Sequence, residues 1–400
     1  MPPHVVDWLN LIFRWAHVTI GIAWIGSSFY FNWLENSLNR DDPREGIEGS
    51  LWAVHGGGFY FVEKLDVAPD EMPDKLHWFM YEAYFTWVTG ICLLAIVYYL
   101  RPDAFLLGAN PAGIGAWTGI GIGVVSLILA WLVYDLLCRS PLGENNVVLT
   151  VLGFIIMTAA AWGFTQVFNP RAAYIHVGAM IGTMMAGNVF FVIIPAHQEL
   201  VDAVEEGREP DAAVGEHAAM RSLHNNYLTL PILYIMISNH FSSTWGHEYN
   251  WVILAGLALT GAAVRHWFNL RGRGDLNVWI LPAAAIGIAA LGIVTSPNLK
   301  IGEPAPAYVD HEPVSYKKAE AIIANRCVQC HSENPSDDIF AVAPAGVKFD
   351  TPEQIKQYAD RIMIRAVEQK NMPFNNKTNM TRKERTILGA WIHQGAKLDE

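Results

Sequence analysis

Charged residues are scarce in this chain of 400 residues: they make up 16% of the sequence, against about 25% in an average soluble domain. Hydrophobic residues make up 52%, and the mean hydropathy is +0.21. So much apolar surface needs lipid as its solvent, which excludes a disordered chain, a fibrous protein and an ordinary cytosolic enzyme. The composition therefore predicts a membrane protein.

Basic residues and cysteines are also few. The formal net charge is −11, which argues against nucleic acid as a partner because phosphate binding needs clustered positive charge. Four cysteines are too few for a disulfide scaffold. Cys92 and Cys138 lie in apolar runs and are interpreted as small buried hydrophobic residues. Cys327 and Cys330 stand together in a polar segment, so we expect chemistry from this second pair.

Long apolar stretches recur until about residue 295 and then stop. Each has about twenty residues, enough to cross a ~30 Å hydrocarbon core as a helix. Eight spans are expected, at 9–31, 79–100, 117–138, 147–168, 172–195, 226–244, 250–268 and 276–295. We therefore expect an all-α protein: an eight-helix transmembrane bundle over 1–296, a proline-rich linker over 297–314 and a small soluble domain over 315–400.

The distribution of basic residues predicts the orientation in the membrane. Loops 1–2, 3–4, 5–6 and 7–8 hold Arg40, Arg44, Lys64, Lys75, Arg139, Arg208, Arg221, Arg271 and Arg273. The opposite loops hold only Arg101 and Arg171. The positive-inside rule then places the first set in the cytoplasm, and both termini outside. The first residues lack a basic n-region and a cleavage site, so we expect the first helix to be retained as an anchor.

Four histidines occupy similar positions in the two halves of the predicted bundle. His17 and His176 fall near the outer ends of spans, and His77 and His224 near the inner ends. Their surroundings suggest a weak tandem repeat of a four-helix unit, although apolar sequences also resemble one another by chance. Ionisable groups at membrane depth are costly unless they face an interior site. These histidines could ligate a b-type haem or hydrogen-bond a flat heterocycle; alternatively, each is a hydrogen-bonded core or interfacial residue.

Other polar residues also lie where lipid would disfavour them. Glu82 falls inside the second span and has no evident structural role. Asp135 and Arg265 fall near the inner ends of spans, where either could extend to the membrane surface. The segment 55–60, with three glycines beside a histidine and aromatic residues, is either a re-entrant or interfacial segment whose backbone approaches a ligand, or a flexible loop.

The segment Cys327-Val328-Gln329-Cys330-His331 has the spacing C-x-x-C-H. At this spacing two thiols reach the vinyl groups of a haem, and the next histidine ligates the iron. A zinc site would need further soft ligands, but no cysteine follows Cys330. A redox dithiol would leave His331 without a role. The motif therefore predicts one covalent c-type haem.

Three short helices are expected around this haem. They would begin at Ser315, at Thr351-Pro352 and at a capping box formed by Thr381 and Glu384. This pattern resembles class I cytochrome c domains, in which a Met-Pro turn between the last two helices supplies the sixth iron ligand. The resemblance implies Met372 as that ligand, with Met380 as the rival. It also implies haem attachment outside the bacterial cytoplasm, in agreement with the loop charges.

Several motifs of the helical half support a more specific comparison. They are 14–17 (RWAH), 22–31 (IAWIGSSFYF), 55–60 (HGGGFY), 224–231 (HNNYLTLP) and the pair Arg265-His266. They resemble the bacterial membrane-bound urate oxidase (urate hydroxylase) family, which joins eight membrane helices to a C-terminal cytochrome c. The resemblance implies oxidation of urate to 5-hydroxyisourate in the inner membrane, without hydrogen peroxide. Electrons would leave through the haem to a soluble cytochrome c or a terminal oxidase.

A site for urate needs hydrogen-bond donors, an aromatic or apolar slot and a base. The candidate residues are His224, Arg265, His17, His77, His176 and Glu82, with Asn225, Asn226 and Tyr227 as further hydrogen-bonding groups. The first span is also faintly similar to haem-b-binding membrane proteins of the porphyrinogen oxidase type. This similarity leaves an additional b-type haem in the membrane domain as an alternative. Two other functions remain as alternatives: an electron-relay subunit that oxidises quinol or a partner dehydrogenase, and a haem-bearing transporter or sensor.

Overall fold

The computed structural model describes residues 2–41, 44–66, 68–69, 71–108, 112–296, 306–337, 339–340 and 342–398. Within these residues the protein is mostly helical, as the sequence predicts. It also has a two-stranded sheet, so the expectation of an all-α protein is wrong in this detail. Much of the predicted linker lies outside the described residues.

The first 296 residues form a long helical body. Its α-helices are α1 (Pro3–Ser37), α2 (Tyr81–Leu94), α3 (Ala116–Arg139), α4 (Asn146–Val167), α5 (Pro170–Asn188), α6 (Ile194–Glu205), α7 (Ala212–Ser238), α8 (Ser242–Trp245), α9 (Asn250–Gly272) and α10 (Ile280–Val294). The π-helical segment η1 (Ala95–Tyr99) continues α2, and η4 (Val189–Ile193) joins α5 to α6. A further π segment, η2 (Asp103–Leu107), and a 3-10 turn, η3 (Pro141–Glu144), lie in the connections.

Six helical segments of the described residues are long and apolar enough to cross a membrane. They are His4–Ser37, Tyr81–Tyr99, Ala116–Arg139, Asn146–Val167, Pro170–Glu205 and Asn250–Gly272. The predicted spans at 226–244 and 276–295 also fall on helices, α7 and α10, but neither is among these six. α10 has 15 residues and is therefore about 22 Å long, which is less than the hydrocarbon thickness.

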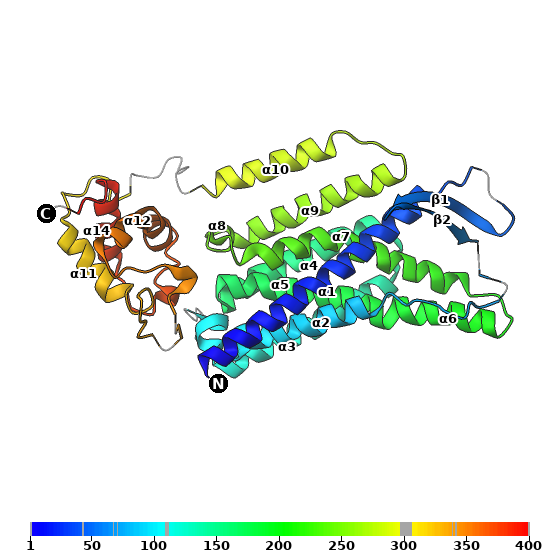
Figure 1. Cartoon of the computed structure of the whole chain (residues 1–400), viewed down its shortest axis with the longest axis horizontal. Coiled ribbons are helices and arrows are strands. Elements are labelled where there is room, and N and C mark those ends of the chain that lie inside the picture. The colour runs from blue at the N-terminus through cyan, green and yellow to red at the C-terminus, as the bar shows by residue number, and fades with distance from the viewer. Residues whose placement is uncertain are drawn as a thin grey trace.

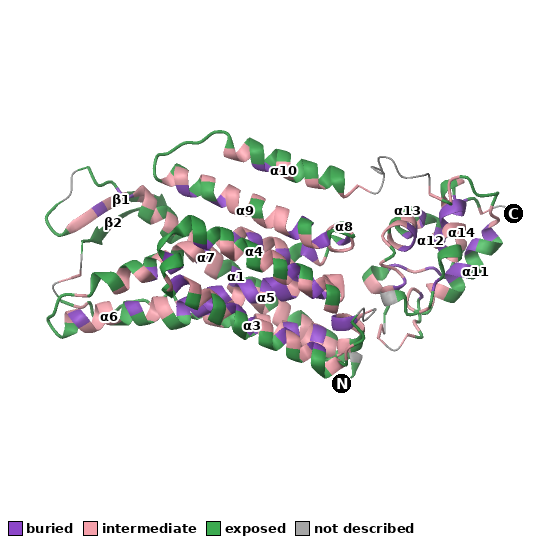
Figure 2. Ribbon diagram, turned by 180° about the vertical axis from the view of Figure 1, so that it is seen from behind, coloured by how far each residue is buried: buried purple, intermediate pink, exposed green. Residues whose placement is uncertain are grey.

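The arrangement of the elements gives the molecule two distinct ends. Figure 1 shows the N-terminus and the C-terminal domain at one end, and the β-hairpin and α6 at the other. Both ends of the chain therefore lie toward the same end of the molecule. Figure 2 shows exposed residues along the outer faces of the helices and buried residues in the interior. Many of the exposed side chains are large and hydrophobic, as expected for helices that face lipid.

α5 is the central helix of the body. The most apolar part of the span Pro170–Glu205, which begins with α5, is 56% buried, compared with 6–28% for the other five spans. Small residues permit the close packing: a Cβ atom on Gly178 would lie 2.6 Å from Ile235, and one on Gly187 would lie 2.5 Å from the ring of Trp131. Close approach at small residues is a common way to pack helices in membranes. Side chains that α5 presents are therefore held rigidly by their neighbours.

A β-hairpin lies between α1 and α2. Its antiparallel strands are β1 (Ile47–His55) and β2 (Gly58–Leu65), and Gly56 and Gly57 connect them. The φ angles of these two glycines are 59° and 83°, the left-handed conformation that a two-residue type I′ turn requires at both positions. The segment 55–60 is therefore an ordered β-turn with its flanking strand ends, and the alternative of a flexible loop is wrong.

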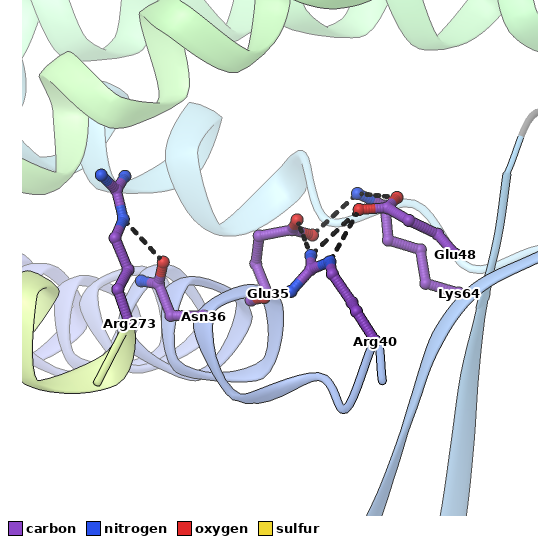
Figure 3. Close-up of polar contacts among 6 residues, drawn as sticks. All are labelled: Glu35, Asn36, Arg40, Glu48, Lys64 and Arg273. Atoms are coloured by element: carbon purple, nitrogen blue, oxygen red, sulfur yellow. Dashed lines mark hydrogen bonds and ion pairs between the residues drawn. The ribbon is translucent and has the colours of Figure 1, made fainter. Parts of the chain in front are cut away.

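Ion pairs hold this hairpin against the end of α1 (Figure 3). Arg40 pairs with Glu35 at 2.7 Å and with Glu48 at 3.0 Å, and Lys64 binds the same two carboxylates at 2.9 and 2.7 Å. These side chains are 32–47% exposed, so each pair contributes only about 0–1 kcal/mol. The network therefore orients the hairpin more than it stabilises the fold.

The C-terminal domain is a small helical unit. Its elements are α11 (Tyr316–Arg326), η5 (Pro344–Gly346), α12 (Pro352–Gln357), α13 (Ala359–Ile362), η6 (Met363–Glu368), η7 (Phe374–Asn376) and α14 (Arg382–His393). Thr351 and Thr381 form capping boxes at the starts of α12 and α14, and the predicted helix starts are confirmed there. Ser315 occupies the N-cap position of α11, but its side chain makes no capping hydrogen bond.

Candidate functional site

A buried ion pair lies in the interior of the helical body, between α3, α5 and α7. Arg221 of α7 is fully buried and donates to Asp135 Oδ1 at 2.7 Å and to Asn188 Oδ1 at 3.2 Å. The other carboxylate oxygen of Asp135 accepts from Arg139 at 2.7 Å. Asp135 therefore neutralises a buried cation as well as binding an exposed one.

Asn188 extends this ion pair into an inner polar cluster, which consists of Tyr134, Asp135, Asn188, Arg221, His224 and Asn225. The Asn188 amide nitrogen donates to Asn225 Oδ1 at 2.8 Å and to the Tyr134 hydroxyl at 3.0 Å. The same hydroxyl hydrogen-bonds His224 Nδ1 at 2.8 Å. Asn188 is the last residue before the π segment η4, and such segments are frequent at functional sites. His224, a predicted site residue, thus belongs to a buried hydrogen-bond network.

A second buried arginine lies on the other side of α7. Arg265 of α9 is 7% exposed, and its Nε donates to Asn226 Oδ1 at 2.9 Å. The same oxygen accepts from Asn269 Nδ2 at 2.9 Å. The guanidinium carbon lies 4.1 Å from the centre of the Phe29 ring, within the range of a cation–π interaction. The Arg265 side chain therefore packs inside the helical body.

The two clusters lie on different faces of α7 because of helical geometry. Asn225 and Asn226 are consecutive residues of α7, so their side chains point about 100° apart around its axis. Asn225 therefore contacts α5, and Asn226 contacts α9.

The outer histidines are hydrogen-bonded within the helical core. His176 is fully buried; its Nδ1 bonds the Ala172 carbonyl oxygen at 2.8 Å, and its Nε2 bonds the Tyr99 hydroxyl at 3.0 Å. His17 bonds the Thr86 carbonyl oxygen at 3.0 Å and the Thr89 hydroxyl at 3.1 Å through Nδ1. These contacts match the alternative of hydrogen-bonded core histidines.

The remaining predicted residues lie apart from the buried clusters. His77 is exposed before α2, and its ring contacts Phe79 with a centroid distance of 4.5 Å. Glu82 lies in the first turn of α2, and its Oε2 is buried without a hydrogen-bond partner among the described residues. In the part of the chain that the structure describes, no hydrogen bond or ring contact joins any two of the four predicted histidines. The structure therefore does not bring them together.

Sequence reasoning missed several members of the two clusters, notably Arg221 and Asn188 in one and Asn269 and Phe29 in the other. A signal was present in the spacing. Arg221 is four residues from Asn225, and Arg265 is four residues from Asn269, so each pair lies on one face of a helix. Paired polar residues at this spacing within an apolar run indicate a face that meets another polar group.

A cavity in the C-terminal domain contains the C-x-x-C-H motif. Its lining includes Cys327, Cys330, His331, Met372, the aromatic residues Phe340, Phe349, Tyr358 and Phe374, and the arginines Arg326, Arg361 and Arg365. Met380 is not among the lining residues described; it is 3% exposed and packs in the hydrophobic core of the domain. The structure therefore brings together the four residues predicted for the haem site.

The chemistry of this cavity fits a covalently held haem. His331 Nδ1 donates to the Val347 carbonyl oxygen at 2.9 Å, which leaves Nε2 unprotonated and able to bind a metal. Burial lowers the pKa of His331, which also favours the neutral ligand form. Arginines on the lining could bind the two propionate carboxylates of a haem.

The environment of Cys327 disfavours a redox dithiol. Burial raises the pKa of its thiol to about 12, whereas reactive dithiols have a lowered pKa that exposes a thiolate. A protonated Cys327 thiol that faces a largely apolar cavity is better suited to holding a hydrophobic group than to exchanging electrons itself.

Contacts join the C-terminal domain to the outer end of the helical body. They are the hydrogen bond of Arg101 to the Ile339 carbonyl oxygen (3.2 Å), that of Ser242 to Gln369 Oε1 (3.0 Å), and the ring contact of Phe105 with Phe374 (centroids 5.2 Å apart). Phe374 also lines the cavity. One aromatic contact therefore connects the wall of the cavity with the helical body.

Comparison with known proteins identifies the helical half. A family model described as the urate oxidase N-terminal family matches residues 3–296. No curated protein and no solved structure matches the chain. The match covers both buried clusters and ends before the C-terminal domain, so it bears on the helical body alone.

Proposed function

Because the chain belongs to the urate oxidase N-terminal family, we propose that its helical body oxidises urate to 5-hydroxyisourate. The match over residues 3–296 is the observation that carries this proposal. In this reaction urate loses two electrons and two protons, and water supplies the new hydroxyl group. The protein must therefore bind a planar anion, accept protons and pass two electrons to an acceptor, without molecular oxygen or hydrogen peroxide.

The acceptor that we propose is a c-type haem bound to residues 315–400 as a small class I cytochrome c domain. Cys327 and Cys330 would hold it, His331 and Met372 would be the axial ligands, and the lining arginines would bind its propionates. A haem with histidine and methionine ligands supplies a one-electron acceptor of raised potential. The contact of Phe105 with Phe374 keeps the cavity next to the helical body. A soluble cytochrome c or a terminal oxidase would then receive the electrons.

Anaerobic urate distinguishes this function from the relay alternative. We expect urate added to the purified, oxidised full-length protein to produce the reduced haem spectrum, with up to two haems reduced per urate because each haem takes one electron. Stopped-flow absorbance measures the rate and the stoichiometry. Reduction by a quinol but not by urate would favour the electron-relay subunit instead. Pyridine haemochrome spectra of the same protein distinguish c-type from b-type haem and therefore test for the additional b-type haem.

We also propose a bacterial inner-membrane location with eight spans. Six are the long apolar segments described above, and α7 and α10 would be the other two. The loop charges and the shared end of the two termini support a periplasmic C-terminal domain (Figure 1). A reporter that is active only in the periplasm should be active when fused after Glu400 and inactive when inserted near Arg44. The reverse pattern would contradict both the orientation and periplasmic haem attachment.

A further inference from the structure

Arg265 is a buried cation without a counterion among the described residues. Among the described residues no carboxylate forms an ion pair with it, and the one hydrogen bond that it makes there runs from Nε to Asn226 Oδ1. Its two terminal nitrogens therefore have no hydrogen-bond partner there. A buried unpaired charge is costly, and proteins generally pair such charges with another group. A bound anion could therefore neutralise the charge of Arg265.

Arg221 provides the contrast within the same helical body. It is more deeply buried than Arg265, yet Asp135 neutralises its charge at 2.7 Å. Its Nε lacks a partner, but the ion pair leaves no net charge for a ligand to balance. The inner polar cluster is therefore complete electrostatically, whereas the cluster around Arg265 is not.

Asn226 presents a second unsatisfied donor beside Arg265. Its Oδ1 accepts from both Arg265 Nε and Asn269 Nδ2, which determines the orientation of the amide group. Its Nδ2 is consequently directed elsewhere, and this atom is buried without a partner in the described residues. Asn226 is fully buried. Two groups on neighbouring side chains, one charged and one neutral, thus lack acceptors among the described residues.

The surroundings hold these donors in position. Phe29 of α1 lies against the guanidinium, at 4.1 Å, and restricts its plane. Further along the same two helices, Arg273 donates to Asn36 Oδ1 at 3.2 Å and ties the end of α9 to the end of α1 (Figure 3). Arg265 lies eight residues before Arg273, or roughly 12 Å along the helix. The contact between α1 and α9 is therefore held from its end, and the donors are preorganised.

We infer that Arg265 and Asn226, with Phe29 beside them, form the contact that binds the urate anion between α1, α7 and α9. Urate is planar and anionic near neutral pH, and its carbonyl oxygens and ring nitrogens accept hydrogen bonds at its edge. A guanidinium fork and an amide donor match such an edge, because arginine presents several N–H groups in one plane. This inference rests on the proposed function for the identity of the anion.

Equilibrium binding of labelled urate tests the site without turnover. The haem-loaded, full-length protein is first reduced chemically, so that it can bind urate but cannot oxidise it. We expect Arg265→Gln to weaken urate binding by about 10- to 100-fold, the effect of losing hydrogen bonds to a charged group. Arg271→Gln removes the same charge from an exposed position in the last turn of α9 and should leave the affinity unchanged.

Asn226→Asp is the sharper variant because it keeps the shape of the side chain and can keep both hydrogen bonds to Oδ1. The new carboxylate would neutralise Arg265 and replace the unsatisfied donor with an acceptor, so urate binding should fall at least as far as in Arg265→Gln. Wild-type affinity in both variants would overturn this site and leave the proposed function intact. If the wild-type protein binds no urate, the proposed function fails, and this inference fails with it. Haem spectra and thermal midpoints verify that each variant is folded.

Discussion

Replacing Cys327 and Cys330 together with alanine is expected to remove all covalently held haem and to abolish urate-driven electron transfer. Both side chains line the cavity of the C-terminal domain beside His331, and they are the only thiols of that domain. Without thioether bonds, any haem in the cavity would be released when the protein unfolds. Haem peroxidase staining after denaturing, reducing electrophoresis measures the retention. Wild-type protein should stain, and the double variant should not.

Controls separate haem attachment from haem ligation. Cys92→Ala changes a cysteine of α2 and should retain full staining. Met372→Ala should also retain staining but lose the low-spin absorbance of a histidine–methionine haem, because only the sixth ligand is removed. Met380→Ala should keep that absorbance and instead lower stability, since Met380 is buried in the core of the domain. Complete extraction of haem from the wild type by acidified organic solvent would refute covalent attachment.

Asp135→Ala is expected to destabilise the helical body by about 3–5 kcal/mol, the usual cost of leaving one partner of a buried ion pair without the other. Arg221 is fully buried, and Asp135 is its only carboxylate partner among the described residues. The expected result is a clearly lower thermal unfolding midpoint of the detergent-solubilised protein. Replacing Arg221 with methionine in the same chain should recover much of the loss, because the unpaired charge is then gone.

The second partner of Asp135 supplies a matched control. The Arg139 side chain is 58% exposed and binds the other oxygen of the same carboxylate at 2.7 Å. Exposed pairs of this kind contribute about 0–1 kcal/mol. Arg139→Ala should therefore change the midpoint little. Equal decreases in the unfolding midpoint for Asp135→Ala and Arg139→Ala would contradict this prediction. The ion pair with buried Arg221 would then contribute no more to stability than the ion pair with exposed Arg139.

Local features of the fold could be predicted from the sequence because their causes are local. The apolar runs predict membrane-spanning helices, and the structure has helices at all eight expected positions. The capping boxes at Thr351 and Thr381 involve residues only three positions apart, so their formation follows from sequence spacing. The β-hairpin was missed although the same kind of signal was present: Gly56-Gly57 stands between two strands.

The amino-acid sequence by itself determined that the chain is mostly helical and rich in apolar spans, and that Cys327, Cys330 and His331 lie side by side, since these properties depend on neighbouring residues. The partners of the buried polar groups depended on tertiary packing. Asn225 and Asn226 are identical neighbours in the sequence, yet one completes the cluster around Arg221 and the other contacts Arg265. The helices that pack on either side of α7 decide this difference. Packing also decides the partners of the two arginines. α3 presents the carboxylate of Asp135 to Arg221 and neutralises it. α1 presents the ring of Phe29 to Arg265, which leaves Arg265 without a counterion among the described residues.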